Sequence, residues 1–440
     1  MKSNTFVSLD LILLLLLVPA QMLGNFEGVS FILAVSLFLY ILLEFWQPLS
    51  SYSALINQSP KIRLAFFARF FLLLIIITAA VIIPSGQRIY TRLIIDAEKA
   101  ENRVAYGDIH DGALQMEYAL GYLRAGQNPY VARYEDTILQ YYNFPGLEDL
   151  PTNPVFDYFV YLPGFLVASY PVYTLFQYYH IPYDQRWIYL LAYIATVILL
   201  PAMVNSPTLK LSLLIAVALN PLLTRPVIIG MNDVLVLLVI IIAILALRRN
   251  HFILSILAFA IACTLKQSAW FIAPFYLLLL YHSLPTSNRN REMFKLLGAG
   301  ALVGALIIIP FAFWDLPNFI TDVFVYPGGG VAVNYPIRGS TIGLLLLGMG
   351  FITSPTDNFP FFIFQLLLGI PLLIGLLKYQ KRQNNVGVML ICAGTFIFGM
   401  GLISRFFQDN YVGFLTVIII LGIFLKLPDK GIAVLLRSAD

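Results

Sequence analysis

The chain has 440 residues, of which 60% are hydrophobic and only 11% are charged, and its formal net charge is +4 at pH 7. This composition excludes a water-soluble fold, because no such fold carries so high an apolar share with so few charged residues. The small positive charge does not indicate a nucleic-acid partner. A transmembrane helix needs about 20 apolar residues, and its backbone must satisfy its own hydrogen bonds in lipid. Repeated apolar runs therefore predict an all-α, polytopic membrane protein.

The apolar runs give thirteen candidate transmembrane segments. They lie near residues 7–23, 28–46, 66–84, 155–179, 187–204, 209–228, 233–247, 251–266, 267–282, 294–313, 360–378, 386–403 and 409–426. We expect the first run to be a retained helix rather than a cleaved signal peptide, because a second long run follows at once. The run 209–228 contains Pro221 and Pro226, so it is the first suspect for a segment that does not cross fully. We therefore expect about twelve transmembrane helices.

Basic residues in the short connections set the expected orientation, because such residues favour the cytoplasmic side. They are Lys61, Arg63, Arg248, Arg249, Arg289, Arg291, Lys295, Lys378, Lys381 and Arg382, with Lys426, Lys430 and Arg437 in the tail. Both termini are then cytoplasmic. The single domain 1–440 carries a large outer loop at 85–155 and a second one at 314–352. Residues 341–352 are apolar but short, which favours an interfacial or re-entrant segment.

The first outer loop contains GDIHDGALQMEYALGYLRAGQNPY, residues 107–130. From Ala113 its apolar residues recur at helical spacing, which predicts an amphipathic juxtamembrane helix on the outer bilayer surface. Gly126 is expected to end this helix, and Asn128-Pro129 to form the turn after it.

Two aspartates, Asp108 and Asp111, precede this helix. Either one could cap the helix, because its first backbone N–H groups lack partners. A carboxylate fixed at the lipid boundary could instead take a proton from an acceptor hydroxyl. His110 is a second titrating candidate, although a lone histidine is more often structural. Both interpretations stay open from the residues alone.

The pattern Asp-Gly-…-Gln-x-Glu-x-Ala-…-Leu-x-x-Gly-x-Asn-Pro-Tyr resembles the first outer loop of the GT-C superfamily. These integral-membrane glycosyltransferases use polyprenyl-phosphate sugars, and the mannose-dependent branch is the most similar. Weaker matches are Gly-Met-Asn-Asp at 230–233 and Thr-Leu-Lys-Gln-Ser-Ala-Trp at 264–270. The resemblance implies a GT-C-like fold with Asp111 as the catalytic base and Asp108 as the alternative base. It also implies an inverting transfer of a mannose-like sugar. Two features differ from those of some branches of the superfamily. Two extra helices precede the active loop, and the sequence has no Asp-Glu pair.

A polyprenyl-phosphate donor agrees with the sequence, which lacks a P-loop, a Gly-x-Gly-x-x-Gly motif and an Asp-x-Asp pair. The departing phosphate needs nearby cations. Lys266, Arg405 and Arg338 are the candidates. Lys266 could also be a snorkelling residue at a helix end, and Arg405 could pair with Asp409.

Further substrate-binding candidates are Asp233, His110, Gln115 and Tyr130. Asp233 could bind a sugar hydroxyl, pair with Lys266 or cap a helix. We expect no cofactor and no metal, since the four histidines and two cysteines are scattered. Cys263 and Cys392 both lie in apolar runs, which does not support a disulfide framework.

The sequence thus predicts a hexosyltransferase of a prokaryotic plasma membrane with its active site on the outer face. Its expected partners are the polyprenyl-phosphate donor, the bilayer, and a glycan, glycolipid or protein acceptor. Two other functions remain open: a transporter or flippase, which would need charges within its spans, and a polymerase or ligase of lipid-linked glycans. A non-catalytic assembly factor is a third alternative.

Overall fold

The structure is a computed structural model that describes residues 8–23, 25–47, 59–95, 109–141 and 156–427. The regular secondary structure of this part of the chain is helical except for two very short strands. They are β1 (Arg338–Gly339) and β2 (Phe406–Phe407), which pair in parallel. The predicted all-α class is therefore confirmed.

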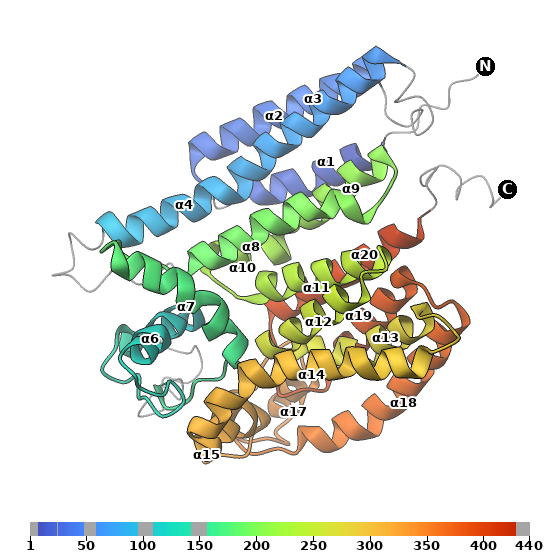
Figure 1. The fold of residues 1–440 in the computed structure, drawn as a ribbon. Helices are drawn as coiled ribbons and strands as arrows, with labels where there is room; N and C mark the ends of the chain where they lie inside the picture. The colour runs from blue at the N-terminus through green and yellow to red at the C-terminus, as the bar shows by residue number, and fades with distance from the viewer. Residues whose placement is uncertain (1–7, 24, 48–58, 96–108, 142–155, 428–440) are drawn as a thin grey trace.

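The N-terminal helices form one edge of the molecule (Figure 1). They are α1 (Leu9–Met22), α2 (Glu27–Trp46), α3 (Pro60–Ile77), η2 (Thr78–Ile82), α4 (Ile83–Tyr90) and η3 (Thr91–Ile95). From α3 to Leu93 the chain is one long helix with a π-helical turn at η2. Pro84 explains this turn, because its ring displaces the carbonyl of residue 80 from regular helical bonding. Helix α1 packs on α2 and α9, and α2 packs on α3.

The middle of the chain forms the core of the bundle. Its elements are α6 (Asp111–Arg124), η4 (Ile138–Tyr141), α7 (Pro163–Tyr178), α8 (Arg186–Leu199), η6 (Leu200–Met203), α9 (Pro207–Ala218), α10 (Pro221–Ile229), α11 (Asp233–Arg248), α12 (Phe252–Leu265) and α13 (Ser268–Ser283). Helix α11 packs on α8 and α12, and it is apolar on all sides because it is buried among them.

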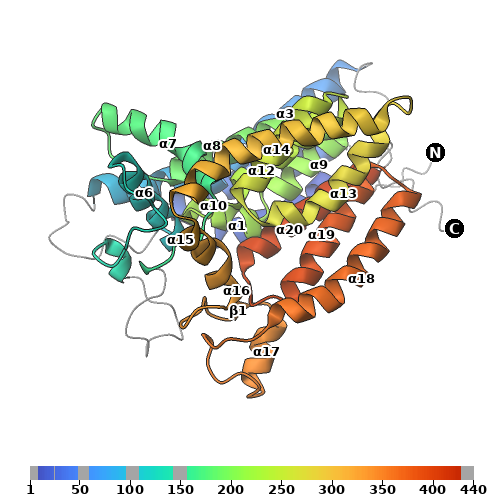
Figure 2. The same cartoon turned by 60° about the horizontal axis from the view of Figure 1, so that its bottom comes forward.

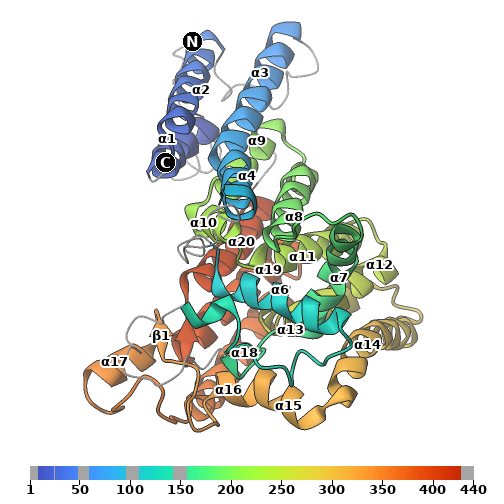
Figure 3. The same ribbon diagram turned by 90° about the vertical axis from the view of Figure 1, so that its left-hand side faces the viewer.

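The C-terminal part completes the bundle beside α11–α13. Its elements are α14 (Arg289–Trp314), α15 (Leu316–Ile320), η7 (Thr321–Val325), α16 (Tyr326–Gly328), β1, α17 (Ile342–Gly348), α18 (Phe361–Arg382), α19 (Val386–Leu402), β2 and α20 (Asp409–Lys426). Helices α19 and α20 pack closely along each other, and α19 also contacts α13 and α18. In Figures 2 and 3, α17 and β1 project from the end of the bundle at which α18 begins.

The expected number of about twelve transmembrane helices is wrong for the described residues. Six helices are long and apolar enough to cross a membrane: Glu27–Trp46, Pro60–Leu93, Arg186–Met203, Arg289–Trp314, Phe361–Arg382 and Asp409–Lys426. Several other predicted segments form helices of 12 to 17 residues. At 1.5 Å per residue, these are shorter than the hydrocarbon core of about 30 Å. The six long apolar helices still indicate a multi-pass integral membrane protein.

The suspect run 209–228 is indeed interrupted. Helices α9 and α10 are bent by 51° at a short break, and counting them as one span would raise the number to seven. Asn220 begins α10, because its Oδ1 accepts a hydrogen bond from the Leu222 N–H at 3.0 Å and Pro221 follows it.

Two surface predictions have different outcomes. Helix α6 starts and ends close to the predicted positions, with Gly126 after it at φ +75°. Its apolar face is covered by protein rather than lipid: Met116 and Leu120 are fully buried, and α6 packs on α7. The short apolar segment after residue 341 forms α17, and Leu345 within it and Met349 and Phe351 just after it are exposed.

Candidate functional site

A cavity of about 400 Å³ lies where several chain segments meet. Its walls come from the beginning of α6, the beginning of α7, the α10–α11 and α12–α13 turns, the η7–α16 segment, α18, and the connection between α19 and α20. Every one of these segments borders a helix end. Helix ends carry backbone groups and polar caps, so a polar cavity inside an apolar bundle forms most readily there.

Asp111 and His110 lie at the beginning of α6 and line this cavity. The His110 N–H donates to the carbonyl of Ile229 at 2.7 Å, which attaches α6 to the end of α10. The Gly112 N–H is shared between Asp111 Oδ1 at 2.7 Å and His110 Nδ1 at 3.1 Å. His110 is thus the residue that caps α6. The Asp111 side chain is 21% exposed, which leaves its carboxylate accessible from the cavity.

Tyr161 meets the same end of α6. A Cβ atom on Gly112 would lie 1.8 Å from the Tyr161 hydroxyl oxygen, so only glycine permits this approach. Burial raises the pKa of the Tyr161 hydroxyl, and the negative charge of Asp111 raises it further. A neutral phenol therefore lies at the same end of α6 as the carboxylate.

Lys266 directly follows α12 and faces the cavity. Its Nζ lies 2.7 Å from Asp233 Oδ1 and 3.1 Å from Asn232 Oδ1, both at the beginning of α11. It also lies 4.6 Å from the centre of the Tyr411 ring. Asp233 Oδ2 in turn accepts a hydrogen bond from Asn410 Nδ2 at 2.6 Å. The lysine is therefore held by α11 and α20, and Asp233 pairs with it, as one of the alternatives above anticipated.

Arg405 also lines the cavity, but its guanidinium is bound by backbone carbonyls. Its Nε donates to Tyr335, and its two terminal nitrogens donate to Asp357 at 2.8 Å and Pro355 at 2.9 Å. Burial lowers the pKa of Arg405 to about 10. The structure shows no ion pair between Arg405 and Asp409. Arg405 therefore fastens the loop before α18 onto the end of α19.

The remaining predicted residues fall into three groups. Gln115 lines the cavity and donates to the carbonyl of Tyr158 at 2.9 Å. Tyr130, Arg338 and Asp233 do not line it, although Asp233 pairs with Lys266, which does. Tyr130 is buried and donates to the carbonyl of Tyr161 at 2.7 Å, so it supports a cavity residue. Arg338 belongs to β1, opposite Phe406. Asp108 lies outside the described residues.

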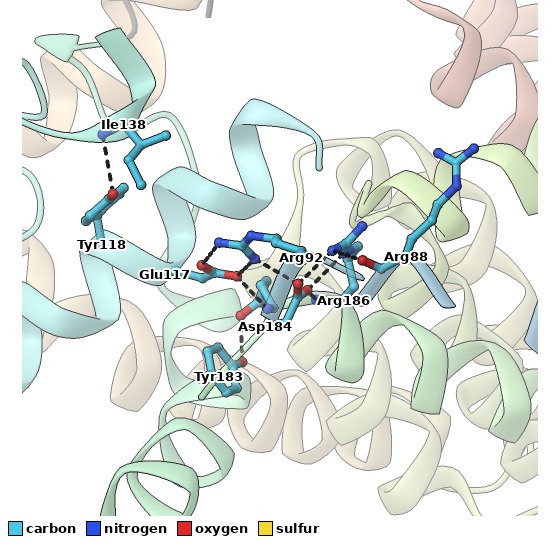
Figure 4. A network of polar contacts seen from close by, with 9 residues as sticks. Arg88, Arg92, Glu117, Tyr118, Ile138, Tyr183, Asp184 and Arg186 are labelled. Atoms are coloured by element: carbon cyan, nitrogen blue, oxygen red, sulfur yellow. Dashed lines mark hydrogen bonds and ion pairs between the residues drawn. The ribbon is translucent and has the colours of Figure 1, made fainter. Parts of the chain in front are cut away.

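A network of four charged residues orients α6 beside the cavity (Figure 4). We call Arg92, Glu117, Asp184 and Arg186 the ion network. Arg92 lies between Glu117, at 2.7 Å, and Asp184, at 2.8 Å. Asp184 also accepts two hydrogen bonds from the guanidinium of Arg186, at 2.9 and 2.7 Å. The network joins η3, α6 and the beginning of α8.

Several cavity residues were not selected from the sequence, among them Tyr161, Tyr326, Ser268 and Asn410. Asn410 had a usable signal, since SRFFQDNYV is a polar insertion between two apolar runs. Tyr161 and Tyr326 had none, because interfacial tyrosines are common anchors. Among the described residues, no group of three histidine, cysteine, aspartate or glutamate side chains could hold a metal ion.

Comparisons with known proteins leave the chain without a match. No protein-family model, no curated protein and no solved structure is similar to it at the level that indicates a relationship.

Proposed function

We propose that the protein is a GT-C-like glycosyltransferase that moves a mannose-like sugar from a polyprenyl phosphate to an acceptor hydroxyl on the extracytoplasmic face. One observation carries this proposal. Asp111 and Lys266, which come from distant parts of the chain, line one cavity that is also lined by apolar side chains. A base, a cation and an apolar surface are the three elements that such a transfer requires.

Asp111 supplies the base. Within the described residues its one hydrogen bond is from the Gly112 N–H to Oδ1, which leaves Oδ2 for an incoming alcohol. The alcohol oxygen attacks the anomeric carbon as Asp111 takes its proton, and the bond to the phosphate oxygen breaks. A single displacement inverts the anomeric centre, because no sugar becomes attached to the enzyme.

Lys266 supplies the positive charge for the leaving phosphate. Asp233 fixes the position of the ammonium group, and the lysine side chain remains 13% exposed on the cavity side. A preorganised cation of this kind stabilises charge that develops during the reaction without further rearrangement. The Arg405 guanidinium is occupied by carbonyls, so in this proposal it shapes the site rather than binding the phosphate.

The apolar wall provides a path for the polyprenyl chain. It includes Phe361 and Phe362 of α18 and Met400 of α19. Phe362 both lines the cavity and is 61% exposed. In this proposal the cavity opens to lipid beside α18, so that an isoprenoid chain can lie in the bilayer while its phosphate reaches Lys266.

The test is the replacement Asp111→Asn, assayed by sugar transfer from a polyprenyl-phosphate donor in proteoliposomes. Loss of the base should lower the transfer rate by about 10²- to 10⁴-fold while membrane insertion stays normal. Asp157→Asn is the matched control, because this aspartate is exposed and lies outside the cavity. Transfer at the wild-type rate by Asp111→Asn would overturn the assignment. Mass spectrometry of lipid-linked sugars in cells lacking the protein would identify the donor and product.

A transporter or flippase is the second candidate, because charges do occur among the N-terminal helices. Arg69 of α3 is fully buried and lies 2.5 Å from Glu44 of α2. The Tyr40 hydroxyl donates to the buried Asp10 of α1. Buried charges within membrane helices often mark transport pathways. A transporter should move a fluorescent lipid-linked sugar across proteoliposomes and should tolerate Asp111→Asn, which separates it from a transferase.

A further inference from the structure

Three side-chain polar atoms around the cavity have no hydrogen-bond partner within the described residues. They are the Tyr326 hydroxyl, Ser268 Oγ and Asn410 Oδ1. They come from three separate elements, α16, the beginning of α13, and α20. Buried polar atoms are almost always paired, because an unpaired one has lost its hydrogen bonds to water without replacement. Three such atoms around one cavity indicate a ligand that supplies the missing partners.

Tyr326 is held rigidly without using its hydroxyl. Its ring stacks on Tyr158 at 4.1 Å between centres and meets the edge of Tyr335 at 5.8 Å. Only 1% of the residue is exposed. Packing alone would be satisfied by phenylalanine, so the hydroxyl is the part of this side chain that the fold does not explain.

Asn410 presents a hydrogen-bond acceptor of defined identity. Its amide nitrogen must face Asp233, because the carboxylate can only accept. Its Oδ1 is therefore the unpaired atom, and it accepts but cannot donate. A phosphate group, which also only accepts, would be repelled there, whereas an alcohol would be bound.

We propose that Tyr326, Ser268 and Asn410 form a subsite that recognises hydroxyl groups of the transferred sugar ring. This inference rests on the proposed function and adds the residues that select the sugar. Hydroxyl groups both donate and accept, so they can bind the two protein hydroxyls and the Asn410 oxygen at the same time. Lys266, which contacts the other carboxylate oxygen of Asp233, would bind the phosphate. The polar part of the cavity is thereby divided between a neutral ring and a charged leaving group.

The test is equilibrium binding to the full-length protein in nanodiscs, with polyprenyl-phosphate mannose and its monodeoxy analogues as probes. Tyr326→Phe and Ser268→Ala each remove only the unpaired hydroxyl. Each variant should bind the complete donor about tenfold more weakly, the ratio expected for one lost hydrogen bond. For each variant, the analogue that lacks the sugar hydroxyl bound by the removed protein hydroxyl should bind the wild type and that variant equally. The melting temperature should stay the same or rise, since no protein hydrogen bond is removed.

Tyr193→Phe is the matched control. Tyr193 is also fully buried, but its hydroxyl donates to the carbonyl of Ala218 at 2.7 Å and the residue does not line the cavity. This variant should melt at a lower temperature and bind every donor as the wild type does. If both hydroxyl variants bind all donors as tightly as the wild type, the subsite is wrong, and the Asp111→Asn transfer assay still decides the proposed function. If no donor binds the wild type, both proposals fail.

Discussion

The ion network and the cavity pair Lys266–Asp233 are both buried groups of opposite charge, but they are built differently. In the ion network, Asp184 is fully buried and its two oxygens bind two arginines. None of its four members lines the cavity. In the cavity pair, Lys266 faces open space and neighbouring Asn410 retains an unpaired oxygen. The closed network therefore positions helices, whereas the cavity pair leaves atoms for a ligand.

Asp184→Asn breaks the closed network and should have the largest effect on stability. The amide carries no charge and its nitrogen cannot accept from either arginine, so Arg186, which is 1% exposed, loses its charge partner. Removing one member of a buried ion pair costs about 3–5 kcal/mol. We expect a marked fall in the melting temperature of the detergent-solubilised protein.

Lys295→Met provides the control for this variant. Lys295 is exposed and pairs with Glu292 within one turn of α14, at 2.8 Å. Exposed pairs of this kind contribute about 0.3–0.5 kcal/mol. Equal destabilisation by Asp184→Asn and Lys295→Met would contradict the distinction between a closed buried network and an ordinary surface pair.

Arg405→Lys should have an intermediate effect. A lysine keeps the charge but cannot reach three carbonyls with the planar geometry of a guanidinium. A Cβ on Gly329, at φ +91°, would lie 2.8 Å from an Arg405 nitrogen, so Gly329 is packed against this side chain. Losing these hydrogen bonds should cost about 1–3 kcal/mol and expose residues 329–357 to proteolysis.

Limited proteolysis with mass spectrometry checks the role of Arg405. Faster cleavage within residues 329–357 in Arg405→Lys would show that Arg405 has a structural role, like the residues of the ion network. Cleavage at the wild-type rate, combined with weaker binding of the polyprenyl-phosphate donor, would instead assign Arg405 a role as a phosphate ligand. That is the role expected from the sequence.

The sequence predicted the α-helical class and the boundaries of α6 well, because both follow from local patterns. Apolar runs identify helices, and Gly126 ends α6. The number of transmembrane helices could not be read in the same way. A helix such as α11 is apolar all round because other helices bury it, and nothing in its composition separates this burial from contact with lipid.

For the candidate site, the sequence selected Asp111, Lys266 and Gln115, which the fold brings to one cavity. Their polar character within apolar surroundings was a sufficient signal. The carbonyl partners of Arg405 could not be foreseen, because they belong to a loop distant in sequence. The unpaired hydroxyl of Tyr326 was equally hidden, since whether a buried atom has a partner depends on tertiary structure.

Asp322 is a third kind of buried charge site, with neither an ion-pair partner among the described residues nor a place in the cavity wall. It is 2% exposed, and its carboxylate accepts a hydrogen bond from the Phe159 N–H at 2.8 Å. Burial raises its pKa to about 8. In the unfolded chain the pKa of an aspartate is about 3.9, so between these values the folded protein holds a proton that the unfolded chain releases.

Asp322→Asn should therefore have an effect on stability that depends on pH and is small only at about pH 4 and below. The contribution of Asp322 to stability is complete below about pH 4 and is lost as the pH rises to about 8, by at most about 1.4 kcal/mol per pH unit. Asparagine stays neutral and can still accept from Phe159. The melting temperature of Asp322→Asn should consequently rise relative to that of the wild type between pH 5 and 8. The control Glu135→Gln, at an exposed carboxylate, should follow the wild-type slope. Parallel curves for wild type and Asp322→Asn would show that Asp322 is ionised in the folded protein, and a partner equivalent to those in the ion network would then be required.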